Sequence, residues 1–314
     1  MTAGSTNESR ITFEALTKRY GARTVLDGFD VGVRPGSVTA LLGPNGSGKT
    51  TALRVLLGLE RATSGRALIG GREYRTLDHP VQRIGALLDA SWVHPRRSAG
   101  DHLAWIARAS GIATDNVTRA LAEVGLSGVA DQSAGTFSLG MRQRLGIAAT
   151  ILGDPRVLVF DEPLNGLDQE GVHWVRDFFA RQTEQGRTVL LSTHMLQEVE
   201  HTADRIIVLG QGTVLYEGPT DGLESGESAV EIGVREHPDA DELVHRLAAD
   251  HGWRVEPLPA GTGGPGYLLR GAQVEQVTTA LADTPLILRR VQESGSLEQL
   301  YGRLTATRAD YIGR

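Results

Sequence analysis

The octapeptide Gly43-Pro44-Asn45-Gly46-Ser47-Gly48-Lys49-Thr50 constrains the fold of this chain more than any other stretch. It follows an apolar run at residues 37–42 that predicts a buried strand, and it precedes residues 51–57, whose apolar spacing predicts a helix. A strand, a glycine loop and a helix in this order are the context of a phosphate-binding P-loop. The glycines let backbone N–H groups approach a polyphosphate, and the helix start adds a positive dipole end.

Lysine usage supports this interpretation. Of the 32 basic residues only Lys18 and Lys49 are lysines, so the chain keeps a compact ammonium where a planar guanidinium would fit a phosphate cradle poorly. In such a loop Lys49 reaches the β- and γ-phosphates and the Thr50 hydroxyl binds Mg²⁺. The alternative is an ordinary glycine turn that caps a helix, which does not account for the flanking pattern or the lysine.

Length and composition indicate a globular protein of two domains. The 314 residues suit roughly two domains of about 150 residues each, and the 40% apolar and 22% charged content is ordinary for a soluble protein. The net charge of −6 gives no support to a nucleic-acid surface as the primary role. The absence of cysteine excludes disulfides and thiolate metal sites. Residues 1–10 are polar, lack a signal-peptide core, and are expected to form a disordered tail.

Residues 11–222 carry the pattern of an α/β domain. The clearest apolar runs are of strand length, far short of the roughly 20 residues that span a bilayer, so we expect the chain not to be a membrane channel itself. Residues 89–153 have a helical pattern and predict an inserted helical subdomain. The predicted strands are 11–16, 25–33, 66–70, 84–88, 156–160 and 188–193, and the amphipathic helices of the insertion are 99–110 and 116–124.

Polar side chains follow two of these buried strands. Asp161 and Glu162 come directly after the strand at 156–160, and His194 follows the strand at 188–193. Ligands of open α/β sheets bind at the carboxyl ends of such strands, and an acidic pair there, in a chain with a P-loop, favours Mg²⁺ chemistry. The alternatives are a helix cap for the acids and an ordinary loop histidine for His194.

Residues 223–314 predict a separate accessory domain. Their pattern runs strand, helix, strand, strand, helix, strand, which suggests a small α+β domain of the ferredoxin-like type. The glycine- and proline-rich residues 257–266 are expected to be a flexible loop, and a final helix is expected from Leu297. The expected elements between residues 228 and 291 are 228–234, 240–249, 253–257, 267–270, 274–282 and 286–291. No group of residues in this domain carries recognisable chemistry.

The segment Phe137-Ser138-Leu139-Gly140-Met141-Arg142-Gln143-Arg144 resembles the signature of ABC transporter nucleotide-binding subunits, which usually reads LSGGQ. It precedes Asp161-Glu162, in the order of that family, and the resemblance covers about residues 11–222. It implies a P-loop NTPase core of the α/β class, with an antiparallel β subdomain and a helical insertion. ATP and Mg²⁺ are the cofactors it implies.

The resemblance also implies roles for individual residues. Tyr20, which alone would pass for a strand-end aromatic, matches the side chain that stacks on adenine. Asp161 matches the aspartate that holds Mg²⁺ through water, Glu162 the general base, and His194 the histidine that contacts the γ-phosphate. Besides Tyr20, the residues implied to bind nucleotide are Gly43, Pro44, Asn45, Gly46, Ser47, Gly48, Lys49, Thr50 and Thr51.

The same family pattern predicts a head-to-tail homodimer. Ser138 and Gly140 would cap the γ-phosphate bound by the other subunit, and Asp168 would cross the interface. Because this chain holds one P-loop and one signature, two complete sites need two such domains. ATP would close the pair and hydrolysis would release it.

Three residues depart from the family pattern. Asp89 occupies the position of a glutamine that meets Mg²⁺; its carboxylate either binds the metal and adds negative charge beside the triphosphate, or points elsewhere and caps a turn. We hypothesise that Asp89 slows hydrolysis in the free subunit. In the signature, Leu139 replaces a glycine and Met141 replaces the glutamine, whereas Ser138 and Gly140 are kept.

A signature reading SLGM is similar to those of subunits that export drugs, antibiotics or lipids through a separate permease. Residues 90–100 would then face that integral membrane protein at the cytoplasmic face of the membrane, with Trp92 either as an exposed anchor or packed within the helical insertion. Other candidate functions are a soluble ATPase acting on nucleic acid or ribosomes and a regulatory module with little turnover. The transported molecule is not identified by the sequence.

Overall fold

The computed structural model describes residues 8–220, 229–261, 264–282 and 284–294. The chain divides into two compact units between Gly218 and Pro219. The expected boundary after residue 222 and the expected helix from Leu297 lie outside the described residues. Within the described ranges, no helix has both the length and the apolar character needed to cross a membrane.

A six-stranded sheet forms the centre of the first unit, with the order β5-β6-β7-β3-β8-β9. The pairs β5–β6, β6–β7, β7–β3 and β3–β8 are parallel. Strands β3 and β7 are buried along their whole length, which explains their continuous apolar runs. The strands are β3 (Val38–Leu42), β5 (Ile84–Leu87), β6 (Val157–Asp161), β7 (Thr188–Thr193), β8 (Arg205–Gly210) and β9 (Thr213–Pro219).

Helices α2 (Lys49–Leu56), α7 (Gln169–Glu184) and α8 (Leu196–Thr202) belong to the same core. Leu53 of α2 packs in one apolar cluster with Leu41 of β3 and Val159 of β6. Because α2 starts at Lys49, directly after the glycine loop, this packing fixes the loop to the sheet.

A three-stranded antiparallel sheet, β2-β1-β4, joins this core. It consists of β1 (Ile11–Tyr20), β2 (Arg23–Val33) and β4 (Ser64–Ile69), and it confirms the predicted antiparallel subdomain. Of the residues expected to form a tail, 1–7 lie outside the described part. Ser9 is buried, and Glu8 forms an ion pair with Arg83 at 3.0 Å, so residues 8–10 belong to the folded unit.

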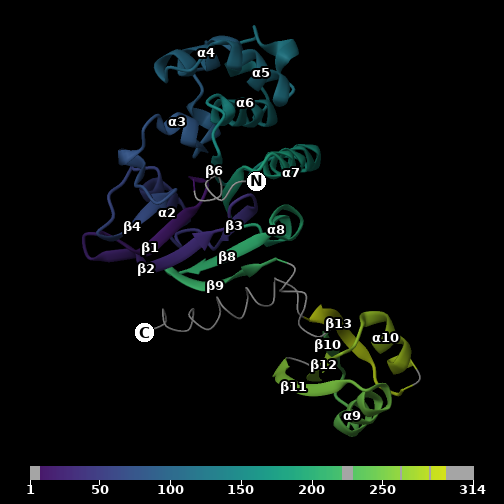
Figure 1. Ribbon diagram of the computed structural model, residues 1–314. Helices are drawn as coiled ribbons and strands as arrows, with labels where there is room; N and C mark the ends of the chain where they lie inside the picture. The colour runs from purple at the N-terminus through teal and green to yellow at the C-terminus, as the bar shows by residue number, and fades with distance from the viewer. Residues whose placement is uncertain (1–7, 221–228, 262–263, 283, 295–314) are drawn as a thin grey trace. The chain divides into compact units, whose positions relative to one another are not determined.

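The inserted helices gather at one end of the first unit (Figure 1). They are α4 (Ala99–Ala109), α5 (Asp115–Glu123) and α6 (Leu139–Ile151); the short α3 (Pro80–Arg83) precedes β5. The start of α4 is fixed by Ser98, whose hydroxyl accepts a hydrogen bond from the Asp101 backbone N–H at 3.1 Å. The predicted helical insertion is thus confirmed.

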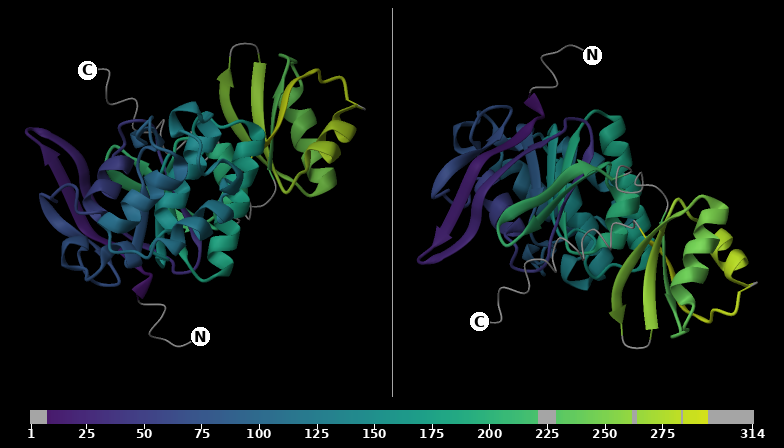
Figure 2. Two further views of the ribbon diagram at one scale, coloured as in Figure 1. Left: turned by 90° about the horizontal axis from the view of Figure 1, so that it is seen from above. Right: turned by 90° about the horizontal axis from the view of Figure 1, so that it is seen from below.

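The second unit has the predicted ferredoxin-like order of elements and an antiparallel sheet β11-β12-β10-β13. Both of its helices lie on one face of that sheet (Figure 2), where Val244 and Val277 pack against Val230 and Leu269. The elements are β10 (Ala229–Val234), α9 (Ala240–His251), β11 (Arg254–Gly261), β12 (Gly264–Arg270), α10 (Val274–Ala282) and β13 (Leu288–Ser294).

The predicted loop at residues 257–266 is wrong. Strand β11 runs to Gly261 and β12 begins at Gly264, with residues 262–263 outside the described part. Among the described strands, β11 lies at the edge of the sheet and pairs with β12 alone, so prolines, which donate no hydrogen bond, are tolerated there.

Candidate functional site

The glycine loop between β3 and α2 needs its glycines. Gly46 and Gly48 have φ angles of 81° and 111°, and a β-carbon on Gly48 would come within 2.7 Å of the Leu26 side chain. Lys49 is only 5% exposed, and its Nζ donates to the Gly43 carbonyl at 2.7 Å and to the Pro44 carbonyl at 3.3 Å. Its ammonium is therefore held inside the curve of the loop.

The parallel register brings the candidate catalytic residues to the same edge of the sheet. Leu42, just before the glycine loop, pairs with Thr193 of β7, and Asp161 of β6 pairs with Ser192. Side chains that follow these strands therefore lie close together, as the general rule for open α/β sheets predicts.

Glu162 stands between the two predicted phosphate-binding side chains. Its Oε1 lies 3.4 Å from Lys49 Nζ, and its Oε2 lies 2.9 Å from His194 Nδ1. Its backbone has a φ of 50°, a left-handed conformation that is uncommon for a residue other than glycine. Strain of this kind concentrates at functional sites.

Ser192 is a residue of this site that the sequence analysis missed. Its hydroxyl donates to Asp161 Oδ1 and accepts from the Glu162 backbone N–H at 3.0 Å. It thus orients both acidic residues at once. Its position at the end of a buried strand does not by itself indicate this role, which depends on β6 and β7 being neighbours in the sheet.

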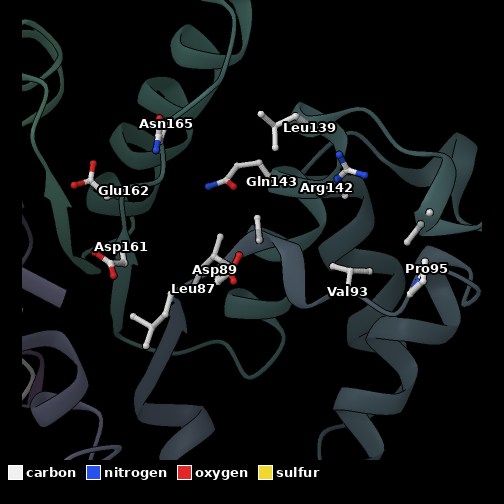
Figure 3. Close-up of a pocket in the computed structure, with 14 residues that line it drawn as sticks. Leu87, Asp89, Val93, Pro95, Leu139, Arg142, Gln143, Asp161, Glu162 and Asn165 are labelled. Carbon is white, nitrogen blue, oxygen red and sulfur yellow. The ribbon is translucent and has the colours of Figure 1, made fainter. Parts of the chain in front are cut away.

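Asp89, Asp161 and Glu162 line one cavity of about 520 Å³ (Figure 3). Gln143 of α6 lines it as well, and its Nε2 donates to the Pro163 carbonyl at 2.9 Å. The structure therefore places Asp89 at the same cavity as the predicted base and metal ligand.

The donor set suits a magnesium ion held mainly by water and substrate. Among the described residues, no group of three or more acidic or histidine side chains is arranged to hold a metal. Asp161 and the Thr50 hydroxyl are hard oxygen donors, and Mg²⁺ commonly takes one or two protein oxygens while keeping waters and substrate phosphates. The residues present thus fit such an ion.

Tyr20 is the last residue of β1 and is 46% exposed. Its hydroxyl donates to Glu60 Oε2 and also contacts the Thr51 side chain at the start of α2. Burial, followed by the bond to Glu60, raises the pKa of the Tyr20 hydroxyl. The predicted nucleotide-binding aromatic is thus linked to the helix that follows the glycine loop.

Ser138, Gly140 and Asp168 line a second, smaller cavity of about 170 Å³. Ser138 caps α6 by accepting from the Met141 N–H at 3.2 Å, and Asp168 caps α7 by accepting from the Gly171 N–H at 2.8 Å. No P-loop residue lines this cavity. The structure thus brings the predicted signature and interface residues together, apart from the P-loop of the same chain.

Trp92 lies directly before the inserted helices. Its ring is tilted against that of His102 on α4, with centroids 4.7 Å apart, and the residue is 46% exposed. It also lines a groove of about 220 Å³ together with Tyr74 and Ile106. One part of Trp92 therefore packs against the inserted helices while the rest faces solvent. Trp92 thus combines the two predicted arrangements, an exposed anchor and a side chain packed in the insertion.

Residues 26–165 match the family model described as ABC transporter. The chain is 36% identical over 217 residues to the lantibiotic transport ATP-binding protein SrtF of Streptococcus pyogenes, covering 69% of this chain and 94% of that protein. It is 33% identical over 310 residues to the daunorubicin resistance ATP-binding protein DrrA2 of Streptomyces coeruleorubidus, covering 95% of each.

A solved structure of an ATP-binding subunit of an ABC transporter superposes with a TM-score of 0.62 at 27% identity, covering 68% of this chain and 91% of that one. The predicted α/β P-loop fold is therefore confirmed. The fold, the P-loop and a relative matched over 95% of its length all indicate the same family. The chain belongs to the ABC transporter family as an ATP-binding subunit, and it is an ATPase.

Proposed function

We propose that this chain hydrolyses ATP to drive a separate membrane permease that exports a drug, antibiotic or lipid-like molecule. The observation that carries the catalytic part is the placement of Glu162, 3.4 Å from Lys49 and 2.9 Å from His194. The export part is supported by the relatives, one named for lantibiotic transport and one for daunorubicin resistance.

In this proposal Glu162 accepts a proton from the attacking water, and His194 contacts the γ-phosphate. Lys49 neutralises the negative charge of the transferring phosphoryl group, which is the main requirement of such reactions. The backbone of the glycine loop binds the β- and γ-phosphates. Tyr20 contacts the adenine.

Mg²⁺ would be held by the Thr50 hydroxyl and by Asp161, with Asp89 as a further oxygen donor at the same cavity. When bound, the ion neutralises charge on the phosphates. Ser192 keeps Asp161 oriented by donating its hydroxyl hydrogen to the carboxylate.

The proposed assembly is a head-to-tail homodimer formed around ATP. Its support is the cavity of Ser138, Gly140 and Asp168, which holds the groups predicted to cap a nucleotide but is not lined by the P-loop of its own chain. A second copy would supply that P-loop, so the site is incomplete without a partner.

The proposed permease contact is the segment 90–100, with Trp92 as its aromatic anchor. A chain acting in this way would sit at the cytoplasmic face of the membrane. A Trp92→Ala variant that keeps its ATPase activity but no longer binds the membrane partner would support this contact. Unchanged binding of the membrane partner would contradict it.

Purification of the tagged chain from gently solubilised native membranes, with a high-salt wash, tests the transport proposal. We expect a multi-spanning membrane protein to remain bound and to stimulate ATP hydrolysis. Recovery of ribosomes, nucleic acid or soluble proteins instead would leave the ATPase chemistry intact and overturn the transport role.

A further inference from the structure

Lys18, the second lysine of the chain, is not a solvated surface residue. Its side chain is only 14% exposed, and its Nζ lies 3.2 Å from Glu60 Oε2 and donates to the Arg61 carbonyl at 2.8 Å. The same ammonium lies 4.7 Å from the centroid of the Tyr20 ring. Lys18 and Tyr20 are two positions apart on β1, so both project from the same face of the strand.

Glu60 joins this lysine to the hydroxyl end of Tyr20. Its Oε2 accepts from both the Lys18 ammonium and the Tyr20 hydroxyl, while its Oε1 lies 3.8 Å from Arg54 Nη1 on α2. Burial pushes the pKa of Glu60 upward, but the hydrogen bonds from Tyr20 and Lys18 outweigh it and leave the pKa below its usual value. Glu60 is therefore a carboxylate at neutral pH.

These contacts restrain Tyr20 at two places. The hydroxyl is fixed to Glu60 and Thr51, and the ring has the Lys18 ammonium beside it. An aromatic side chain that is already immobilised loses less conformational entropy when a flat ligand stacks on it. Because Tyr20 is 46% exposed, part of the residue remains available to that ligand.

We propose that Lys18 and Glu60 are positioning residues that hold Tyr20 as a preset surface for the base of the nucleotide. The inference rests on the proposed role of Tyr20 and extends it to two residues outside the glycine loop. It assigns a function to the only lysine outside the P-loop: a compact ammonium that bonds Glu60 and Arg61 while facing the ring of Tyr20.

A purely structural role makes a different prediction. The Lys18–Glu60 pair also connects β1 to the segment after α2, so its loss could disturb the glycine loop as a whole. Binding of inorganic tripolyphosphate, which has no base, separates the two roles. A positioning role affects only ATP, whereas a structural role affects both ligands.

The test compares steady-state ATPase kinetics of Glu60→Ala, Lys18→Met and Tyr20→Phe with those of the unaltered chain. We expect each variant to raise the KM for ATP on the order of two- to tenfold, the range for ordering one side chain. We expect kcat of Glu60→Ala and Lys18→Met, and the inhibition constant of tripolyphosphate in all three, to stay unchanged. Glu14→Ala is the matched control, because it removes the exposed Glu14–Arg66 ion pair of the same subdomain.

Unchanged KM in the variants, or an equal loss of tripolyphosphate binding, would overturn the inference. If Glu60→Ala fails to fold, Tyr20→Phe still tests it, since that change removes only the hydroxyl and keeps the ring. Absence of ATP hydrolysis by the unaltered chain would instead count against the proposed function, so the two failures are distinguishable.

Discussion

Lys49 Nζ lies 3.4 Å from Glu162 Oε1, so the P-loop cation and the proposed general base are ion-paired within one chain. A γ-phosphate would compete with Glu162 for the same ammonium, because both are anions. Binding of ATP would then free the carboxylate of Glu162 to accept a proton from water. This exchange of partners would connect occupancy of the site to activation of the proposed base.

Glu162→Gln removes the proton acceptor and keeps the shape of the side chain. We expect the rate of phosphate release to fall about 10²- to 10⁴-fold, the usual contribution of a general base, while ATP binding persists. Phosphate-release kinetics and gel filtration with ATP would measure this, and the variant should accumulate as an ATP-bound dimer. A rate within a factor of two of the unaltered chain would remove Glu162 from the mechanism.

Asp89→Gln restores an uncharged amide at the cavity of Asp161 and Glu162. Because one of three nearby carboxylates is removed from a site for a triphosphate, we expect ATP hydrolysis by the isolated chain to rise. Steady-state hydrolysis at saturating Mg²⁺ and ATP measures the effect. A large fall would contradict this expectation and show that the site needs the negative charge of Asp89, since the glutamine side chain still offers an oxygen to Mg²⁺.

Gly166→Ala tests the contact between the signature and the segment before α7. Gly166 has a φ of 74°, and a β-carbon there would lie 2.9 Å from Leu139 Cδ2. The left-handed backbone should cost about 1–2 kcal/mol of unfolding free energy. The Leu139 side chain can move aside, but that movement disturbs the signature, so we expect ATPase activity to fall on the order of 10- to 100-fold.

Gly71→Ala is the matched control for that variant, since Gly71 has a φ of 79° and no atom lies within 4 Å of the place that a β-carbon would take. It should lose similar stability in urea unfolding and keep its activity. Equal ATPase rates in the two variants would contradict the predicted link. Combining Gly166→Ala with Leu139→Ala should recover part of the lost rate.

His102 should make stability depend on pH. It is 2% exposed, and burial, followed by the charges of Arg97 and His94, lowers its pKa. The unfolded chain takes up a proton at this histidine near pH 6.5, roughly its ordinary pKa, whereas the folded chain does so only at lower pH. The unfolded state therefore binds more protons in that interval, and stability falls as pH drops below about 6.5.

Urea unfolding of the intact chain between pH 8 and pH 5 would measure this dependence. His102→Phe keeps an aromatic ring beside Trp92, and its free energy of unfolding should depend less on pH between pH 8 and pH 5. His173→Gln, which removes an exposed histidine, is the control. If the unfolding free energy of His102→Phe changed with pH as steeply as that of the unaltered chain, other groups would account for the pH dependence.

The elements that could be predicted from the sequence are those indicated by residues adjacent to one another in the chain. The strand before Gly43, the helix after it and the acidic pair at the end of β6 each follow from adjacent residues. So does the alternation of elements in the accessory unit. The error at residues 257–266 arose because proline and glycine indicate a turn locally. Only the sheet order reveals that β11 is an edge strand, where proline is tolerated.

The parts of the site that could not be predicted depend on long-range contacts. Glu60 lies 40 positions from Tyr20, and Ser192 lies 31 positions from Asp161. Neither belongs to a recognisable motif, and a glutamate or serine on its own indicates nothing specific. Their roles follow from which strands are neighbours, which a single sequence does not specify.

The scarcity of lysine has a practical consequence for chemical labelling. Amine-directed reagents meet only two side-chain targets in this chain, one inside the P-loop and one beside Tyr20. The extent of modification of Lys49, measured by mass spectrometry, would therefore report whether the proposed phosphate site is occupied. The modification of Lys18 would report on the proposed adenine site at Tyr20. No background of surface lysines would obscure either signal.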